Sequence, residues 1–293
     1  MLKRMLIVGA TAGLFSTGAW ADGQSSTCPT LKMPLQTALQ QAISTVKGTL
    51  GLGLNMWATV VAPDGHVCYV TYSSNDAIQG QWLASRAISA QKAFTANTLS
   101  LGPTSSSGSG TGLATGKLAL STANLYSAVQ PEGSLFGLQE SNPVFAPGAY
   151  GDTITPGQNG QASYTGPVNT KNYGTANDPM IGQVIGGINV FGGGLALYTS
   201  GGNKVGGVGV SGDTSCTDHL IAWNLRHNLG LDHLGTVNGV SQEPGLPDNI
   251  VFDITPNSYG IQASAKGWGH PSCGAGNGPA TAAAQALPPV ANP

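Results

Sequence analysis

Residues 205–222 read VGGVGVSGDTSCTDHLIA, and the architecture can be read outward from this stretch. Its first half alternates valine with glycine, which is typical of a strand against which another backbone or a ligand packs closely. The turn at 209–212 then leads into an apolar helix, predicted from about Ser215 to Leu229. The first amides of such a helix can point toward an anionic group.

The flanking chain shows further helical and strand-like periods. They predict a helix over 34–46, a hairpin of 55–62 with 66–72, a helix over 81–96, a shorter helix over 113–129, and two strands at 194–199 and 204–210. Hairpins and helices in this order indicate an α+β fold, an antiparallel sheet with flanking helices, in a single domain.

The composition excludes several classes of protein. The 293 residues include 11 Lys+Arg and 13 Asp+Glu, and only 8% are charged. So few basic side chains cannot neutralise a row of phosphates, which excludes a polybasic nucleic-acid binder. The 44 glycines and 18 prolines predict long loops. We expect a domain over 22–240 with a loop insertion at 131–183, then a C-terminal extension over 241–293 that is disordered from about 274.

The N-terminus has the three parts of a secretory signal. Lys3 and Arg4 precede an apolar run from Met5 to Phe15, and Ala19-Trp20-Ala21 supplies small residues at the cleavage positions. The apolar run is shorter than the roughly 20 residues that span a bilayer. We therefore expect residues 1–21 to be removed, no membrane span, and a periplasmic or secreted protein.

An even number of cysteines in an oxidising compartment favours disulfides. Cys28, Cys68, Cys216 and Cys273 allow three connectivities. We favour Cys28 with Cys68 and Cys216 with Cys273, because each pair would tie a terminal segment to the core.

Two motif matches in the opening stretch fail in their context. Residues 207–212 fit G-x-G-x-x-G, and Asp232 lies where a ribose-binding acid would stand, but no further βαβ unit follows. Asp213 replaces the last glycine of G-x-S-x-G. No nucleophile motif is present, so no catalytic residue is predicted, and enzymatic activity is the weaker expectation.

Histidines are the best candidates for binding a metal. His219 and His227 are eight residues apart on the predicted helix, roughly 80° around its axis, so they cannot simply chelate one ion. Either could be an axial ligand to heme iron, and the alternative for each is a structural histidine. Lys92 is either a surface residue or the partner of a ligand carboxylate.

Two stretches together resemble the GlcG/HbpS-type heme-binding family. Ser85–Ala96 reads SRAISAQKAFTA, similar to the family's A-x-x-K-A-x-T-A helix. Residues 209–212 and Asp218 match its G-V-S-G strand end and following aspartate. The turn at 61–65 and the glycines at 192–194 also resemble family positions, although the family's arginine near Asn75 and the proline after the glycines are missing.

The resemblance implies a profilin-like sheet and a secreted protein that binds heme or another small molecule, for capture, buffering or sensing. It also implies a homo-oligomer. By this analogy the ligand would lie near Lys92, Thr95, Gly193, Gly194, Ser211, Gly212, Asp218 and His219. The alternative is an enzyme or accessory subunit acting on a small organic molecule, with Asp218 or His219 as acid or base.

Overall fold

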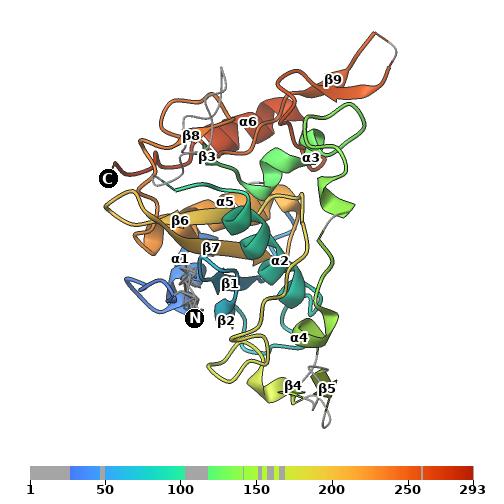
Figure 1. Ribbon diagram of the computed structural model, residues 1–293. Helices are drawn as coiled ribbons and strands as arrows, with labels where there is room; N and C mark the ends of the chain where they lie inside the picture. The colour runs from blue at the N-terminus through green and yellow to red at the C-terminus, as the bar shows by residue number, and fades with distance from the viewer. Residues whose placement is uncertain are drawn as a thin grey trace, which may run out of the picture.

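A four-stranded antiparallel sheet forms the centre of the computed structural model (Figure 1). Its strand order is β2 (Val67–Tyr72), β1 (Trp57–Val61), β7 (Lys204–Ser211) and β6 (Gly194–Tyr198). The structure describes residues 27–46, 50–102, 118–140, 142–150, 154–156, 162–164, 169–258 and 260–292.

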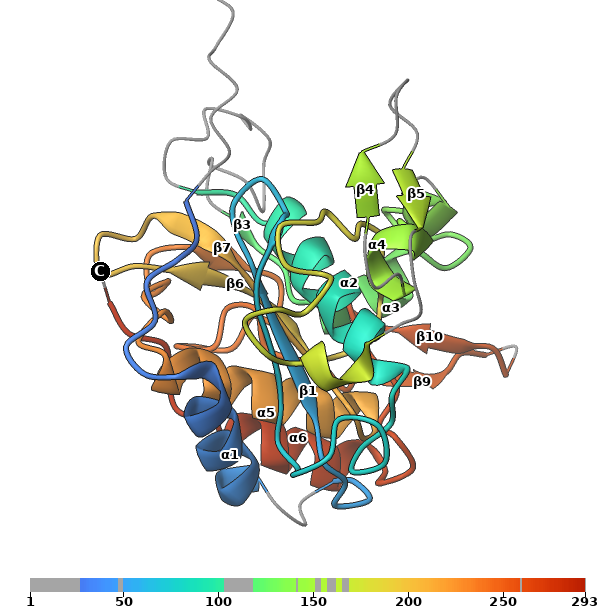
Figure 2. The same ribbon diagram turned by 90° about the horizontal axis from the view of Figure 1, so that it is seen from below.

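The two faces of the sheet differ because successive side chains of a strand point to opposite sides. In β7, Val208 and Val210 belong to the larger core cluster, with α1 (Leu35–Val46) and α5 (Ser215–Asn228). Gly207 and Gly209, which alternate with these valines, face α2 (Ser85–Thr98). The fold therefore has three layers: α2 covers one face of the sheet, and α1 and α5 cover the other face (Figure 2).

Glycines bring the backbone of α2 directly against β7. A Cβ on Gly209 would lie 2.0 Å from the carbonyl oxygen of Ser89, and one on Gly207 would lie 2.4 Å from that of Ala93. A buried contact of 2.7 Å between the hydroxyls of Thr59 and Ser89 adds a polar link between β1 and the same helix.

The remaining elements are short, apart from α6, and lie around these layers. In chain order they are β3 (Leu118–Ala119), η1 (Thr122–Asn124), α3 (Leu125–Ala128), η2 (Leu138–Glu140), α4 (Ala146–Tyr150), β4 (Ile154–Pro156), β5 (Ala162–Tyr164), η3 (Thr170–Asn172), β8 (Asn238–Gly239), β9 (Ile254–Pro256), β10 (Gln262–Ser264) and α6 (Asn277–Gln285).

The α+β class, the antiparallel sheet and its flanking helices are confirmed. The helix predicted over 113–129 is wrong in its described part, where β3, η1 and the four-residue α3 follow one another. Both favoured disulfides, Cys28–Cys68 and Cys216–Cys273, are also present. The predicted signal peptide over 1–21 lies outside the described residues. Among the residues that are described, no helix is long and apolar enough to cross a membrane.

The prediction of disorder from about 274 is wrong where the chain forms α6. Ala280 and Ala284 are buried in the larger core cluster, and Leu287 and Val290 follow them. The indole nitrogen of Trp223 donates to the carbonyl of Pro288 at 2.9 Å. Small alanines let α6 pack closely, and composition alone does not reveal such a contact.

The 131–183 segment has only short elements, but it is more than a surface loop. Its Tyr173 and Met180 are buried in the core cluster that contains the alanines of α2. Arg86 of α2 donates to the carboxylate of Asp178 and to the carbonyl of Ala149, and its guanidinium lies 4.0 Å from the centre of the Tyr173 ring. The insertion therefore covers the outer side of α2.

Replacing Gly209 by alanine tests the contact between α2 and β7. The new methyl group would overlap the backbone of Ser89 and Ala93, so we expect a loss of about 3 kcal/mol or more in the free energy of unfolding. Gly278→Ala is the control, because its Cβ meets nothing within 4 Å. Denaturant unfolding measures both, and equal stability of the two variants would refute the close contact.

Candidate functional site

A buried ion pair joins α2 to α5 beside the end of β7. The Lys92 ammonium lies 2.7 Å from a carboxylate oxygen of Asp218 and donates to the carbonyl of Val210 at 3.2 Å. Both charged side chains are only 3% exposed. A buried charge needs such a partner, so these two family-like residues first of all satisfy each other.

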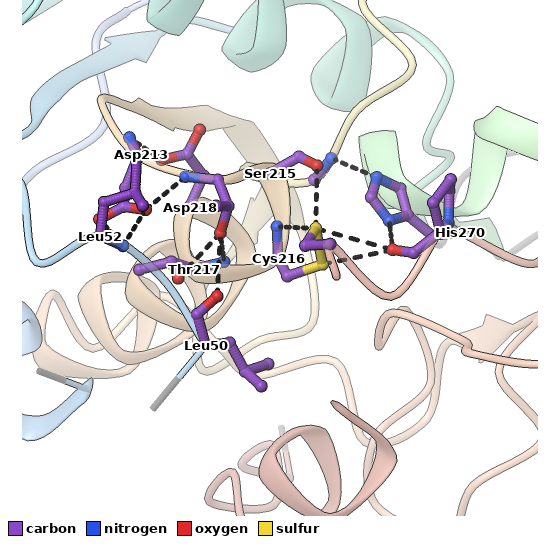
Figure 3. The surroundings of a disulfide bond; sticks show 12 residues. Leu50, Leu52, Asp213, Ser215, Cys216, Thr217, Asp218 and His270 are labelled. Atoms are coloured by element: carbon purple, nitrogen blue, oxygen red, sulfur yellow. Dashed lines mark hydrogen bonds between the residues drawn. A yellow bond between two sulfur atoms is a disulfide. The ribbon is translucent and has the colours of Figure 1, made fainter. Parts of the chain in front are cut away.

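The second oxygen of the Asp218 carboxylate accepts the backbone N–H of Asp213 at 3.0 Å (Figure 3). Burial raises the pKa of Asp218 to about 6, although the ammonium of Lys92 acts in the opposite direction. Asp213 in turn accepts the amides of Leu52 and Leu54, at 2.8 and 3.0 Å, and so fixes the loop that precedes β1.

The glycine turn closes over this pair. Gly193 has a φ of +117°, and a Cβ there would lie 2.4 Å from the carbonyl oxygen of Val210 and 3.0 Å from Cβ of Asp218. A Cβ on Gly194 would lie 2.4 Å from the carbonyl oxygen of Lys92. The glycines thus permit contact of protein with protein at the position where a ligand was expected.

The first amides of α5 also have partners within the chain. The amide of Thr217 donates to the side chain of Thr214, and that of Asp218 donates to the Thr214 carbonyl. The amide of Cys216 faces Sγ of Cys273 at 3.2 Å, beside the disulfide (Figure 3). The expectation that these amides point toward an anionic ligand is therefore not supported.

The structure places the other predicted binding residues against neighbouring backbone. The hydroxyl of Thr95 lies 2.8 Å from the carbonyl oxygen of Gln91 and 3.2 Å from that of Gly187, and it accepts the amide of Asn189 at 2.9 Å. Ser211 is 4% exposed at the end of β7. A Cβ on Gly212 would lie 2.3 Å from the carbonyl oxygen of Asn55, so this glycine allows two chain segments to approach.

The two histidines predicted as metal ligands lie in opposite environments. His219 is fully buried, and its Nε2 accepts the amide of Ile250 at 3.2 Å. Its Nδ1 has no hydrogen-bond partner among the described residues. The His227 side chain is 49% exposed, and its Nδ1 lies 2.7 Å from the carboxylate of Asp232.

Burial is also the main reason why two histidines remain neutral. It lowers the pKa of His219 to about 3, with the positive charge of Arg226 as the next cause. Burial likewise lowers the pKa of His270 to about 4, against the effect of its hydrogen bond to the Pro271 carbonyl.

The C-terminal extension seals this region with residues that the sequence did not reveal. The carboxylate of Asp248 forms an ion pair with the guanidinium of Arg226 at 2.6 Å, and both side chains are fully buried. His270 lies among the rings of Tyr126, Phe191 and Phe252, and its Nε2 accepts the amide of Gly192 at 3.4 Å. Neither residue belongs to a periodic or motif-like pattern that could have indicated its role.

Two cavities in the described part of the chain lie away from the ion pair. The larger, of about 470 Å³, is a surface hollow lined by residues such as Asn55, Gln79 and Trp82. The smaller, of about 20 Å³, touches Asp213 and Thr217 and has room for about one water molecule. Neither is lined by Lys92, Asp218 or a histidine.

The fold and this region define an α+β protein in which a lysine–aspartate pair and a glycine turn join two helices across a sheet. The family model described as haem degrading protein HbpS-like matches residues 33–225. The chain belongs to this family, which confirms the resemblance seen in its sequence. No curated protein matches the chain.

Solved structures with similarity to this chain have low sequence identity. Klebsiella pneumoniae protein ORFY is 20% identical, with a TM-score of 0.39, over 71% of this chain and 95% of its own. The PduOC:heme complex is 17% identical, with a TM-score of 0.38, over 69% and 97%. A double mutant of Streptomyces reticuli HbpS is 16% identical, with a TM-score of 0.35, over 78% and 99%.

The buried state of His219 predicts how stability depends on pH. The unfolded chain takes up a proton at this residue below pH 6.5, and the folded protein does so only near pH 3. Above pH 6.5 the imidazole is neutral in both states, so the buried ring does not lower the free energy of unfolding. As the pH falls below 6.5, the unfolded state gains a proton that the folded state excludes, and the free energy of unfolding decreases. Between pH 7 and pH 5 we expect this protonation to lower the free energy of unfolding by about 2 kcal/mol.

Denaturant unfolding of wild type and His219→Gln at pH 7 and pH 5 isolates the effect of His219 protonation on the free energy of unfolding. Glutamine retains an acceptor for the Ile250 amide but has no titrating ring, and the contribution of His270 is present in both proteins. Stability that declines in parallel for the two proteins would contradict a buried, neutral His219.

Proposed function

We propose that this protein binds heme or a closely related tetrapyrrole. The observation that carries the proposal is the family match over residues 33–225, because the family is described as haem degrading. Bound heme would supply iron with a coordination position that a protein imidazole can fill.

Of the two histidines on α5, the exposed His227 is better suited to bind heme iron than the fully buried His219. The ring of His227 is held at Nδ1 by the carboxylate of Asp232, and the side chain is half exposed. A carboxylate that accepts from one ring nitrogen fixes the orientation of the other, as around many metal-bound histidines. We propose His227 as the iron ligand. His219, the other predicted ligand, could bind only if the segment around Ile250 moved, since that amide occupies its Nε2.

The other predicted binding residues would act indirectly. They make buried contacts with one another or with neighbouring backbone, so we assign them the task of positioning α5, which carries both histidines. These residues are Lys92, Thr95, Gly193, Gly194, Ser211, Gly212 and Asp218.

A role outside the cytoplasm is part of the same proposal. Two disulfides agree with an oxidising compartment, in which a secreted or periplasmic protein would capture, buffer or sense heme. The proposal includes a homo-oligomer, and sedimentation of the purified protein measures the number of subunits.

An acid–base function remains the second candidate, because burial raises the pKa of Asp218 into a range useful for proton transfer. It would require the closed region around Lys92 and Asp218 to open to a substrate. A protein that shows no saturable heme binding but retains this raised pKa would favour the second candidate.

A hemin titration followed through the Soret band tests heme binding. We expect saturation near one heme per chain and a sharp, shifted band. His227→Ala should weaken binding roughly tenfold or more and change the band. His233→Ala is the matched control, since this neighbouring imidazole binds the Asn292 carbonyl instead of a carboxylate.

A flat or non-saturating titration of the wild type would refute heme binding. If His219→Gln abolished the shifted band and His227→Ala did not, heme binding would stand and the ligand would be His219.

A further inference from the structure

One of the two disulfides lies against an imidazole at the protein surface. Nε2 of His66 is 3.5 Å from Sγ of Cys28 and 3.7 Å from Sγ of Cys68. Cys28 is exposed, and the side chain of His66 is 18% exposed. Cys68 is buried, at 7% exposure, so solvent and small molecules reach this cluster from the side of Cys28 and His66.

A carboxylate sets the direction of this ring. Oδ1 of Asp64 lies 2.6 Å from Nδ1 of His66. A carboxylate can only accept, so Nδ1 carries the proton, and in the neutral ring Nε2 presents its lone pair to the sulfurs. The carboxylate, imidazole and two sulfur atoms have the order found around protein metal sites, where an outer carboxylate orients a ligating histidine.

We propose that reduction of the Cys28–Cys68 disulfide creates a metal site composed of Cys28, Cys68 and His66, with Asp64 as the positioning residue. The three ligand atoms already lie within 4.8 Å of one another. Two thiolates and an imidazole suit Zn²⁺ or Cu⁺, whose preferred ligands are sulfur and nitrogen. A fourth position would remain for water or another small ligand in the case of Zn²⁺.

The reduction needs a dithiol as the electron donor. A thiolate of the dithiol attacks Sγ of Cys28, the exposed residue of the pair, and the sulfur–sulfur bond breaks with Cys68 leaving as a thiolate. The second thiol of the donor then attacks the mixed disulfide and releases Cys28. Two electrons pass from the dithiol, which becomes a disulfide, and its two protons pass to solvent when the metal takes both cysteine thiolates.

The second disulfide provides an internal comparison. Cys216, His270 and Cys273 also place their ligand atoms within 4.8 Å of one another. Cys216 is fully buried there, and Nε2 of His270 already accepts the amide of Gly192. Cys273 is half-buried, whereas Cys28 of the other disulfide is exposed. We therefore expect the Cys216–Cys273 disulfide, which joins α5 to the C-terminal extension, to resist a donor that reduces Cys28–Cys68.

Limited reduction of the folded protein with dithiothreitol, followed by maleimide labelling and peptide mass spectrometry, tests the first step. We expect two labelled cysteines per chain, Cys28 and Cys68, with an unchanged far-ultraviolet circular dichroism spectrum. Labelling of all four cysteines together, or of none without denaturant, would overturn the proposed difference between the two disulfides.

Titration with Co²⁺ after anaerobic removal of the dithiol tests the metal site. We expect one equivalent to bind with a sulfur-to-cobalt charge-transfer band and the visible bands of tetrahedral cobalt, and Zn²⁺ to displace it. The oxidised protein should show neither band. Absence of the charge-transfer band from the correctly reduced, folded protein would refute the site.

Substitutions assign the individual ligands. His66→Ala should weaken Co²⁺ binding at least tenfold and alter the visible bands, and Asp64→Asn should weaken it less, as expected when only the orientation of the ring is lost. His233→Ala is the control imidazole outside the cluster. Equal affinity of His66→Ala and His233→Ala would exclude His66 as a ligand and overturn the proposed site.

Discussion

The direct contact between the backbones of α2 and β7 determines where the family-like residues of this protein lie. Gly207 and Gly209 leave no side chain between helix and strand, so Lys92 extends past the end of β7 and reaches Asp218 on the other side of the sheet. Without the glycines, α2 would be displaced outward and the ion pair would separate. The glycine-rich sequence and the lysine are thus parts of one packing arrangement.

The C-terminal extension then closes the region from the side of α5. A disulfide at Cys216, an ion pair at Arg226 and a hydrogen bond at His219 connect successive turns of this helix to residues 248–273. Each contact removes a polar or reactive group from solvent. The residues that resemble a binding motif consequently satisfy one another, and the imidazole of His227 remains open at the other end of the same helix.

Most of the layered fold could be predicted from the sequence because local periodicity determines it. The alternation of valine and glycine in β7 and the apolar repeat of α2 both depend on neighbouring residues. Spacing could not choose among the three disulfide connectivities, and the pairing that the structure shows was favoured only because it ties Cys28 and Cys273, near the two ends of the chain, to the core. Long-range contacts were not predictable. Asp178 and Asp248 lie on loops far in sequence from the arginines with which they form ion pairs. The helix α6 packs on the core through alanines, a residue type whose abundance near the C-terminus had suggested disorder.

Local sequence also could not indicate which side of α5 the extension covers. His219 and His227 both looked suitable as iron ligands, and only the position of Ile250 distinguishes the buried ring from the exposed one. In the proposed function, heme therefore binds at the exposed end of α5 and leaves the region around Lys92 and Asp218 closed.

Paramagnetic broadening by ferric heme in the amide spectrum of the ¹⁵N-labelled protein tests this claim most directly, because the effect depends on distance from the iron. We expect the amides of residues 227–233 to lose intensity first and those of 187–194 and 211–219 to retain theirs. Early loss of intensity in the latter two segments, with 227–233 unaffected, would contradict it.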